Sequence, residues 1–178
     1  AGYVGDFGAF CSGVGDLLGV SWFGRLRGEF LNLLLELSGN RYGRGLLVPG
    51  GVGATPAPRE HAALLARLDA AEDDLRDTAE MMFDAPSVCS RFERTGVVPR
   101  EVAETLGLVG PVARASGCNR DVRRDHPTGA YRHAPIPVSG EDAGDVMARA
   151  QVRCSETQHS IAFVRARLAE IGARMTSP

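Results

Sequence analysis

The sequence predicts a mainly α-helical protein, a helical bundle with long antiparallel helices and a small extended or turn segment. Two observations carry this prediction. Apolar residues recur at steps of three and four over residues 61–82 and again over 147–175, which is the spacing of one helix face. The stretch that reads as extended is short, residues 45–48, and runs into Pro49-Gly50-Gly51, a type II turn pattern. We expect the two long helices to pack against each other, because an apolar helix face needs a cover.

Length and charge narrow the class of protein. The chain has 178 residues, which suits one domain spanning 1–178, with 44% hydrophobic residues, 24% charged residues and a net charge of −2. This composition is typical of a soluble globular protein and lacks the basic excess of a nucleic-acid-binding domain. The longest apolar run, near residues 31–37, is much shorter than the roughly 20 residues that span a bilayer. We therefore expect no nucleic-acid partner and no direct membrane span.

The N-terminal third predicts one clear helix and one ambiguous segment. Residues 3–18 are rich in glycine, with small residues four apart, so they form either a helix that a neighbour approaches closely or an irregular segment. Asp6 lies there, and a lone aspartate of this kind is more often a cap or an exposed residue. Ser21 is the expected N-cap of a helix over 22–37, which Ser38-Gly39-Asn40 ends.

The two long helices are predicted from their apolar faces. The first runs from about residue 58 to 83, and its face consists of His61, Leu64, Leu68, Ala71, Leu75, Thr78 and Met82. The second face consists of Met147, Ala150, Cys154, Thr157, Ile161, Val164, Leu168, Ile171 and Met175. Between them we expect short helices at 86–94 and 99–106, with irregular chain over 107–117 and 127–144.

The cysteines predict no metal site. Residues 11, 89, 118 and 154 are isolated from one another and form no Cys-x-x-Cys pair. We expect free thiols that pack as small hydrophobes, with a site assembled in three dimensions from scattered cysteines and histidines as the alternative. Cys118 is the one placed in a polar loop, where neighbouring arginines could lower its pKa and make it reactive.

Residues 117–127 concentrate the unusual chemistry of the chain. Within them lie the candidate site residues Arg120, Asp121, Arg123, Asp125 and His126. Arginine offers a planar fork of donors, aspartate accepts two of them, and histidine can change charge near neutral pH. The loop is therefore either a preorganised ionic network beside a reactive centre or a solvated salt-bridge loop. In both cases we expect Asp121 to accept hydrogen bonds from an arginine or from backbone N–H groups and to order the loop.

Four blocks of sequence, taken in order, carry a family resemblance. They are Gly5-Asp6-Phe7-Gly8-Ala9; Leu37-Ser38-Gly39-Asn40-Arg41 running to Val48-Pro49-Gly50-Gly51-Val52; Ala115-Ser116-Gly117 with Arg120-Asp121-Val122-Arg123 and Pro127; and Gly144-Asp145 with Arg149 and Val152-Arg153. The ordered set resembles the large subunit of membrane-bound, energy-conserving [NiFe] hydrogenases of the formate hydrogenlyase type. It also resembles the related 49-kilodalton-type subunit of respiratory complex I (NADH dehydrogenase).

The resemblance implies an oxidoreductase parent that interconverts H2 and protons and passes electrons to an iron-sulfur small subunit. Membrane subunits are further implied partners, with a cytoplasmic, peripheral location on the inner face of the membrane. Such enzymes hold their NiFe centre with two Cys-x-x-Cys pairs, which this sequence lacks. We therefore expect the central fragment of a longer protein, with no catalytic residue, metal ligand or cofactor of its own.

Two alternatives remain open. One is a complex I 49-kilodalton-type subunit that lines a quinone site, although Gly43 and Val48 stand where that branch carries histidine and arginine. The other is a catalytically inert helical scaffold that docks partner proteins. By position, Asp6 matches an acidic residue beside the quinone cavity, and Arg41 matches a recurring polar position, as do Arg120, Asp121 and Arg123. With Asp125 and His126, these residues are candidates for supporting the centre from outside its ligands or for lining the quinone side.

Overall fold

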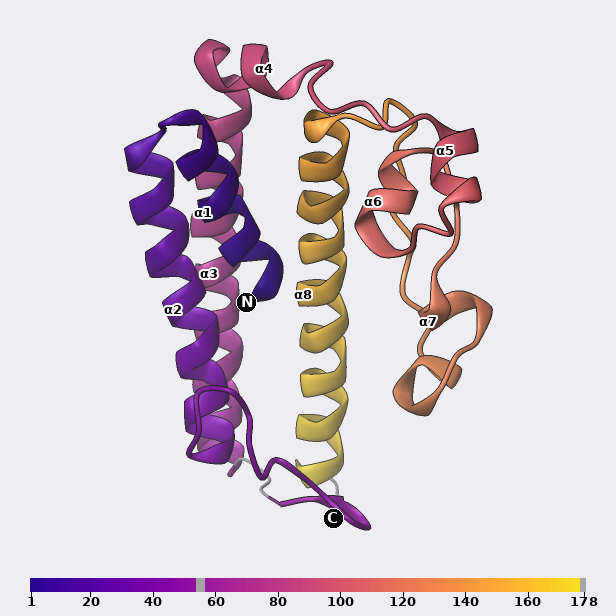
Figure 1. Ribbon diagram of the computed structural model, residues 1–178. Coiled ribbons are helices and arrows are strands. Elements are labelled where there is room, and N and C mark those ends of the chain that lie inside the picture. Colours follow the sequence, from indigo (N-terminus) through magenta and orange to yellow (C-terminus); the bar gives the residue numbers. More distant parts are fainter. Residues whose placement is uncertain (54–56, 177–178) are drawn as a thin grey trace. The chain divides into compact units, whose positions relative to one another are not determined.

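The computed structural model describes residues 1–53 and 57–176 of the chain, which form eight α-helices, one 3-10 helix and a two-stranded sheet (Figure 1). The predicted mainly α-helical class is confirmed. The chain divides into two compact units, residues 1–80 with the chain from Val164 onward, and residues 81–163. The single domain expected from the length stays a prediction.

In the first unit, helix α1 (Gly2–Val14) packs on helix α2 (Leu17–Ser38) (Figure 1). The buried face of α1 is Val4, Phe7 and Cys11. The rings of Phe7 and Phe23 stack with their centroids 5.2 Å apart. The segment is thus helical, but its small residues do not form the contact face as a whole: among them Ala9, Ser12 and Gly13 are exposed.

The predicted start of α2 at Ser21 is wrong, because Asp16 caps the helix instead. Its Oδ1 accepts a hydrogen bond from the backbone N–H of Gly19 at 3.1 Å. Gly15, with φ of +78°, ends α1 in the left-handed conformation that favours glycine. This glycine and the adjacent cap reverse the chain within two residues, so α2 begins one turn earlier than its first aromatic residue suggests.

The predicted extended piece is a small hairpin of strands β1 (Leu47–Val48) and β2 (Gly51–Val52). The strands are antiparallel, and Leu47 lies opposite Val52. Gly50 has a φ of +91°, the sign that the second central residue of a type II turn requires.

Helix α3 (Pro58–Asp84) confirms its predicted face, because every residue from His61 to Met82 in that set is buried. The acidic side of α3 is linked to two other helices of the first unit. Asp74 pairs with Arg25 of α2 at 2.8 Å, and Asp69 pairs with Arg165 of the last helix at 2.7 Å. These pairs are half exposed, so each contributes at most about 1 kcal/mol.

The last helix, α8 (Val146–Thr176), is buried differently from the prediction. Ala150, Thr157 and Ile161 of the predicted face are buried, but Val164 and Ile171 are exposed, and the side chain of Met175 lies outside the described residues. A second row, which consists of Ala148, Val152 and Glu156, is buried instead. Ala115 packs with Ala148 and Val152, so the first half of α8 is covered on two sides rather than one.

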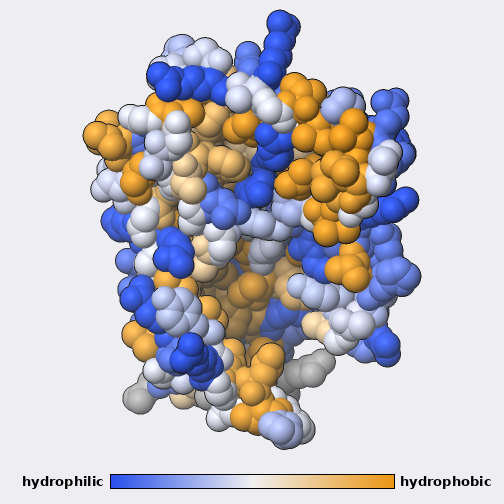
Figure 2. Space-filling view, viewed as in Figure 1, coloured by the Kyte–Doolittle hydropathy of each residue, from blue (hydrophilic) through white to orange (hydrophobic). Residues whose placement is uncertain are grey.

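The second unit contains the first part of α8 and several short helices. They are α4 (Pro86–Phe92), α5 (Arg100–Thr105), α6 (Gly110–Ala115) and α7 (Val122–Asp125), with the 3-10 helix η1 (Gly129–Arg132). Helix α6 lies in a region expected to be irregular, although Pro111 in its first turn is a helix-start signal. Figure 2 shows apolar surface gathered where α5 and α6 lie, and Val97, Leu106 and Val109 of this unit are exposed.

Gly144 and Asp145 hold the segments of the second unit together. The N–H of Gly144 donates to the carbonyl of Ala115 at 2.7 Å, and its own carbonyl accepts from the N–H of Val98 at 3.0 Å. Asp145 accepts from the N–H groups of Ala148 and Arg94, each at 2.8 Å, so it caps α8 and fixes the chain after α4. The start of α8 is thereby fixed to α6 and to the chain before α5.

We predict that Leu68→Ala lowers the free energy of unfolding by about 2–5 kcal/mol, because a buried large side chain is replaced by a small one. Urea denaturation measures the change. The matched control is Leu17→Ala, since Leu17 is 79% exposed and a surface change stays within about 0.5 kcal/mol. Equal losses at the two positions would show that the α3 face is not core.

We predict that Gly144→Ala destabilises the chain by at least about 1 kcal/mol more than Gly107→Ala. Both glycines have left-handed backbone, with φ of +68° and +65°. A Cβ at Gly144 would overlap the carbonyl oxygen of Val98, whereas a Cβ at Gly107 meets nothing within 4 Å. Thermal and urea unfolding of the two variants measure their losses of stability. Both variants carry the strain of left-handed backbone, so the difference between their losses reports the overlap with Val98. Equal losses would contradict the prediction.

Candidate functional site

Four charged side chains of the second unit form a closed ring of alternating sign. Arg114 of α6 contacts Asp121 at 3.1 Å and Glu156 of α8 at 2.9 Å. Arg123 of α7 contacts the same two carboxylates, Asp121 at 2.5 Å and Glu156 at 2.6 Å. Each arginine therefore bridges both acids, and each acid bridges both arginines. We call this set the four-charge ring.

The four-charge ring is buried and electrically neutral. The side chains of Arg114, Asp121 and Glu156 are 4%, 3% and 1% exposed, and Arg123 is 20% exposed. Burying an isolated charge costs several kcal/mol, and pairing offsets this penalty only when the geometry is good. The alternation gives every charge two partners of opposite sign, although Arg114 Nε and Glu156 Oε1 make no hydrogen bond within the described residues. Removal of any one member leaves an uncompensated charge inside the unit.

Local sequence explains how the acid of the loop is held in place. Asp121 is the N-cap of α7, and its Oδ1 accepts from both the backbone N–H and the Nε–H of Arg123 at 2.9 Å. Asp125 Oδ2 in turn accepts from the backbone N–H of Asp121 at 2.9 Å. This exchange resembles a capping box, in which two side chains satisfy the free donors at a helix start. The prediction that Asp121 accepts hydrogen bonds from an arginine and from backbone is confirmed.

Contacts with the arginines shift the pKa values of the carboxylates of the loop. The hydrogen bonds from the Arg123 side chain, helped by its backbone N–H and by the charges of Arg123 and Arg114, lower the pKa of Asp121 to about 2. The hydrogen bond to Asp121 and the proximity of Glu156 raise the pKa of Arg123. The hydrogen bond from Arg124 lowers the pKa of Asp125. These carboxylates are therefore ionised at neutral pH.

The structure brings together only some of the predicted site residues. Asp121 and Arg123 lie in the ring, and Asp125 supports it from its edge. Arg120 and His126 are exposed, although the carbonyl of Arg120 accepts from Arg114 at 3.5 Å. The interpretation of the loop as simply solvated is wrong for Asp121. Asp6, half-buried and with a partner of its own, and Arg41, exposed, belong to the first unit.

Two members of the ring, Arg114 and Glu156, were not predicted. Arg114 stands between two alanines that are both fully buried, a setting in which an exposed arginine is unexpected. Glu156 continues the row of Ala148 and Val152 at steps of four, so it falls on a helix face that is otherwise apolar. A charged residue on an apolar row was the available signal, and it pointed to a buried partner of opposite charge.

Cys11 and Cys118 are buried, whereas Cys89 and Cys154 are half-buried. Cys118 is buried with Ala103 and Ala113, so the expectation of a reactive thiol in the loop is wrong. Burial and the neighbouring carboxylate of Asp16 raise the pKa of the Cys11 thiol to about 12. Within residues 1–53 and 57–176, no group of three histidine, cysteine or acidic side chains is placed to hold a metal ion. The residues present do not fit a NiFe centre, which needs four thiolates in close pairs.

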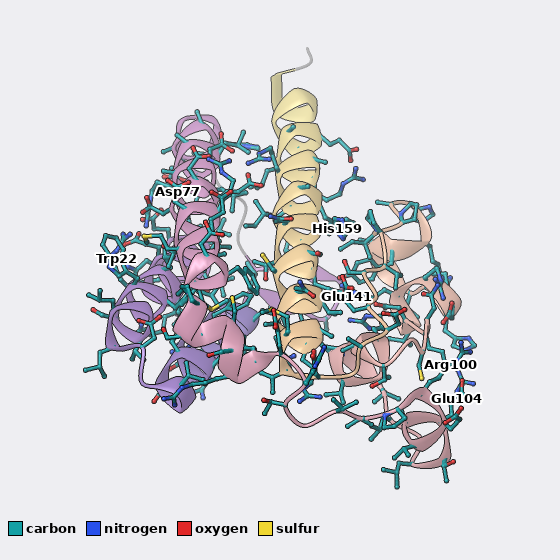
Figure 3. The ribbon with its side chains drawn as sticks, turned by 90° about the horizontal axis from the view of Figure 1, so that it is seen from above. Trp22, Asp77, Arg100, Glu104, Glu141 and His159 are labelled. Atoms are coloured by element: carbon teal, nitrogen blue, oxygen red, sulfur yellow. The ribbon has the colours of Figure 1, made fainter. Side chains whose placement is uncertain are left out.

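An open depression of about 420 Å³ borders the ring. Its lining consists of Arg114, Gly117, Asn119, Val138, Gly140, Glu141 and Asp142. Glu141 lies beside α8 in Figure 3, and its backbone accepts from Gly117 at 2.8 Å and donates to Arg114 at 2.9 Å. None of the helices in the described ranges is long and apolar enough to cross a membrane.

Comparison with known proteins identifies the class. Residues 13–177 match the family model described as the respiratory-chain NADH dehydrogenase, 49 Kd subunit. The chain belongs to this family, which confirms the resemblance found in the sequence.

Particular relatives are redox proteins of several kinds. The chain is 33% identical over 142 residues to NADH-quinone oxidoreductase subunit 4 of Thermus thermophilus, with 79% of this chain and 34% of the relative covered. It is 26% identical over 159 residues to formate hydrogenlyase subunit 5 of Escherichia coli, with 89% and 28% covered. A chain of the membrane-bound sulfane sulfur reductase, an archaeal respiratory membrane complex, aligns with a TM-score of 0.85 at 25% identity, over 96% and 46% of the two chains. The chain spans less than half the length of each.

We predict that Asp121 contributes about 2 kcal/mol to stability at neutral pH, since each pKa unit corresponds to about 1.4 kcal/mol. Its folded pKa of about 2 lies below the ordinary value of 3.8. The contribution is therefore complete above the unfolded pKa and is lost as the pH falls from about 4 toward 2.

Urea denaturation of the wild-type chain and of Asp121→Asn between pH 7 and pH 2 tests this. All other carboxylates are common to both proteins, so their contributions to the pH dependence of stability largely cancel in the difference. The two stability curves should converge by about 2 kcal/mol below pH 4. Curves that stay parallel would show that the ring does not depress the pKa of Asp121.

Proposed function

We propose that this chain is the helical part of an oxidoreductase subunit of the [NiFe]-hydrogenase large-subunit type. Its parent would interconvert H2 and protons and pass electrons to an iron-sulfur partner. The observation that carries the proposal is the similarity to a relative named as a formate hydrogenlyase subunit, 26% identical over 159 residues. Two sequence features favour this branch: the run from Arg120 to Pro127, and Val48 directly before the Pro-Gly-Gly turn.

In this proposal the residues of the chain supply scaffold rather than catalysis. Asp145 and Gly144 fix the start of α8, and the four-charge ring fixes the loop of α7 on α8. The metal chemistry of a hydrogenase requires thiolates, and the four cysteines of this chain are distant in sequence and two of them are buried. The ligands would therefore be supplied by parts of the parent outside these residues.

We also propose that the parent associates with an iron-sulfur small subunit and with membrane subunits, as a peripheral part on the inner face of the membrane. Support comes from the structural neighbour, which is a chain of a membrane-bound respiratory complex. No membrane-crossing helix is found among the described residues, so attachment through partner subunits is the arrangement proposed.

A quinone-reducing subunit of complex I type is the second candidate. It is favoured by the family description and by the relative named NADH-quinone oxidoreductase. The backbone at Gly43 favours the first candidate. Gly43 has a φ of +68°, a conformation that disfavours a side chain such as the histidine of the quinone branch. A histidine in this turn would carry the strain of left-handed backbone, about 1–2 kcal/mol.

We predict that the isolated chain binds no stoichiometric nickel or iron and reduces no dye with H2, whereas the parent complex does. Metal analysis and optical spectra of the anaerobically purified chain, supplied with both metals, test the first part. A tagged parent protein purified from the membranes of its own host tests the second, by H2-dependent viologen reduction and quinone-dependent oxidation of NADH.

Each outcome decides between the candidates. H2-dependent activity in the complex supports the hydrogenase proposal. Quinone reduction without H2 chemistry overturns it in favour of the second candidate. A complex with neither activity, although its iron-sulfur subunit is intact, indicates an inert scaffold. A stoichiometric metal in the isolated chain contradicts the assignment of its residues to scaffold.

A further inference from the structure

The segment from Asn119 to His133 is attached to the second unit mainly through polar contacts. Cys118 before it and Ala134 after it are buried. In between, where the structure describes every residue, Asp121 alone is buried, and helix α7 buries no apolar side chain. We call residues 119–133 the flap and the remainder of the second unit its base. Hydrophobic burial thus contributes little to holding the flap on its base.

The four-charge ring crosses the boundary between flap and base. The flap contributes one cation and one carboxylate, Arg123 and Asp121, and the base contributes one of each, Arg114 and Glu156. Two pairs join flap to base, Arg114 with Asp121 at 3.1 Å and Arg123 with Glu156 at 2.6 Å. The other two pairs lie within one side, Arg123 with Asp121 in the flap and Arg114 with Glu156 in the base.

We propose that the flap is a polar-latched element that undocks from its base while the rest of the second unit stays folded. The alternation of charge is the reason. When flap and base separate, the ring divides into two neutral pairs, one on each side, so neither side keeps an uncompensated charge. Removal of a single member, by contrast, strands a buried charge, which is far more costly. The ring therefore stabilises the docked flap and yet permits its release.

The other contacts between flap and base are few. The ring of Tyr131 lies against that of Phe163 with centroids 5.4 Å apart. Arg114 donates to the carbonyl of Arg120 at 3.5 Å, a long hydrogen bond. At the two ends of the flap, the N–H of Arg120 donates to the carbonyl of Cys118 at 2.8 Å, and the N–H of Ala134 donates to the carbonyl of Ala130 at 3.0 Å. Arg124, in contrast, bonds within the flap, to Asn119 at 3.0 and 2.7 Å. An undocked flap would also lose α7, because one helical turn is not stable in water by itself.

Undocking has a defined consequence for the surface of the unit. Asn119, at the start of the flap, and Arg114, in the base, both line the 420 Å³ depression. Release of the flap would open this depression toward the ring and bring Arg114 and Glu156 into contact with solvent. The flap is therefore a conformational device that controls access to a buried ion pair, and this inference holds for either candidate function.

Native-state hydrogen exchange of the chain tests the proposal without any substitution. The backbone N–H groups of Asp121 and of residues 123–126 donate only to acceptors within the flap. The base therefore does not protect these amides from exchange through hydrogen bonds. We expect them to exchange at least about tenfold faster than α8 amides between residues 150 and 161, through an opening that depends weakly on denaturant. If the two groups show the same rate and the same steep denaturant dependence, the flap does not undock separately and the proposal fails.

The variant Glu156→Gln tests the latch, because it keeps the side-chain shape and removes one crossing pair. Exchange of the flap amides should rise by at least about tenfold, while that of the α8 amides changes much less. The matched control is Glu104→Gln, whose carboxylate is 44% exposed and pairs with Arg100 within α5 at 2.8 Å; it should leave the flap unchanged.

The double variant Glu156→Gln with Arg123→Gln completes the test. It leaves Arg114 and Asp121 as a balanced crossing pair, so flap exchange should be slower than in Glu156→Gln alone. A uniform rise at all amides in Glu156→Gln would overturn the proposal, because the ring would then stabilise the whole unit. Should that variant fail to fold, the wild-type comparison of flap and α8 amides decides.

Discussion

The burial of Glu156 on α8 is the constraint on which the charged contacts of the second unit depend. A carboxylate that is 1% exposed needs counter-charges within hydrogen-bonding distance, and two arginines supply them. Both arginines must then be held by elements outside α8. Helix α6 presents Arg114, and the capped turn of α7 presents Arg123 together with Asp121, which balances the second positive charge. The short helices of this unit are in this sense arranged around one acidic side chain.

That arrangement requires α6 and α8 to be fixed relative to each other, and backbone contacts at Gly144 and Asp145 do this. Gly144 lies too close to the backbone of Val98 for any side chain, and its N–H donates to the carbonyl of Ala115. Its positive φ turns the chain into α8. Asp145 caps α8 and also accepts a hydrogen bond from the backbone N–H of Arg94. Arg94 is not a glycine, yet its φ is positive. Ala115, Ala148 and Val152 then pack beside the ring. Small side chains at this contact allow the helices to approach, which brings Arg114 within 2.9 Å of Glu156.

The sequence predicted the apolar faces that repeat along a single helix, but it missed the contacts that form between two helices. The face of α3 was predicted residue by residue, because one apolar row faces one core. The face of α8 was only half right, since its first part is covered on two sides and its later residues Val164 and Ile171 are exposed. The loop composition identified Asp121 and Arg123, whose contact is local. Arg114 and Glu156 were missed because they lie 42 positions apart, and only the tertiary fold makes them neighbours. Cys118 was assigned to the polar loop by position, yet its side chain turns into an apolar cluster.

The neutrality of the ring bears on what the family fold can do with it. Carboxylates already neutralised by two arginines are poor metal ligands, and an aspartate with a pKa of about 2 is a weak base at neutral pH. The ring therefore suits a positioning role better than a catalytic one, under either proposed function. The relatives similar to this chain are named for different reactions, NADH-quinone oxidoreductase and formate hydrogenlyase among them. A scaffold whose charges are internally balanced does not constrain the chemistry of a neighbouring centre by a net field, so one helical framework is compatible with several reactions.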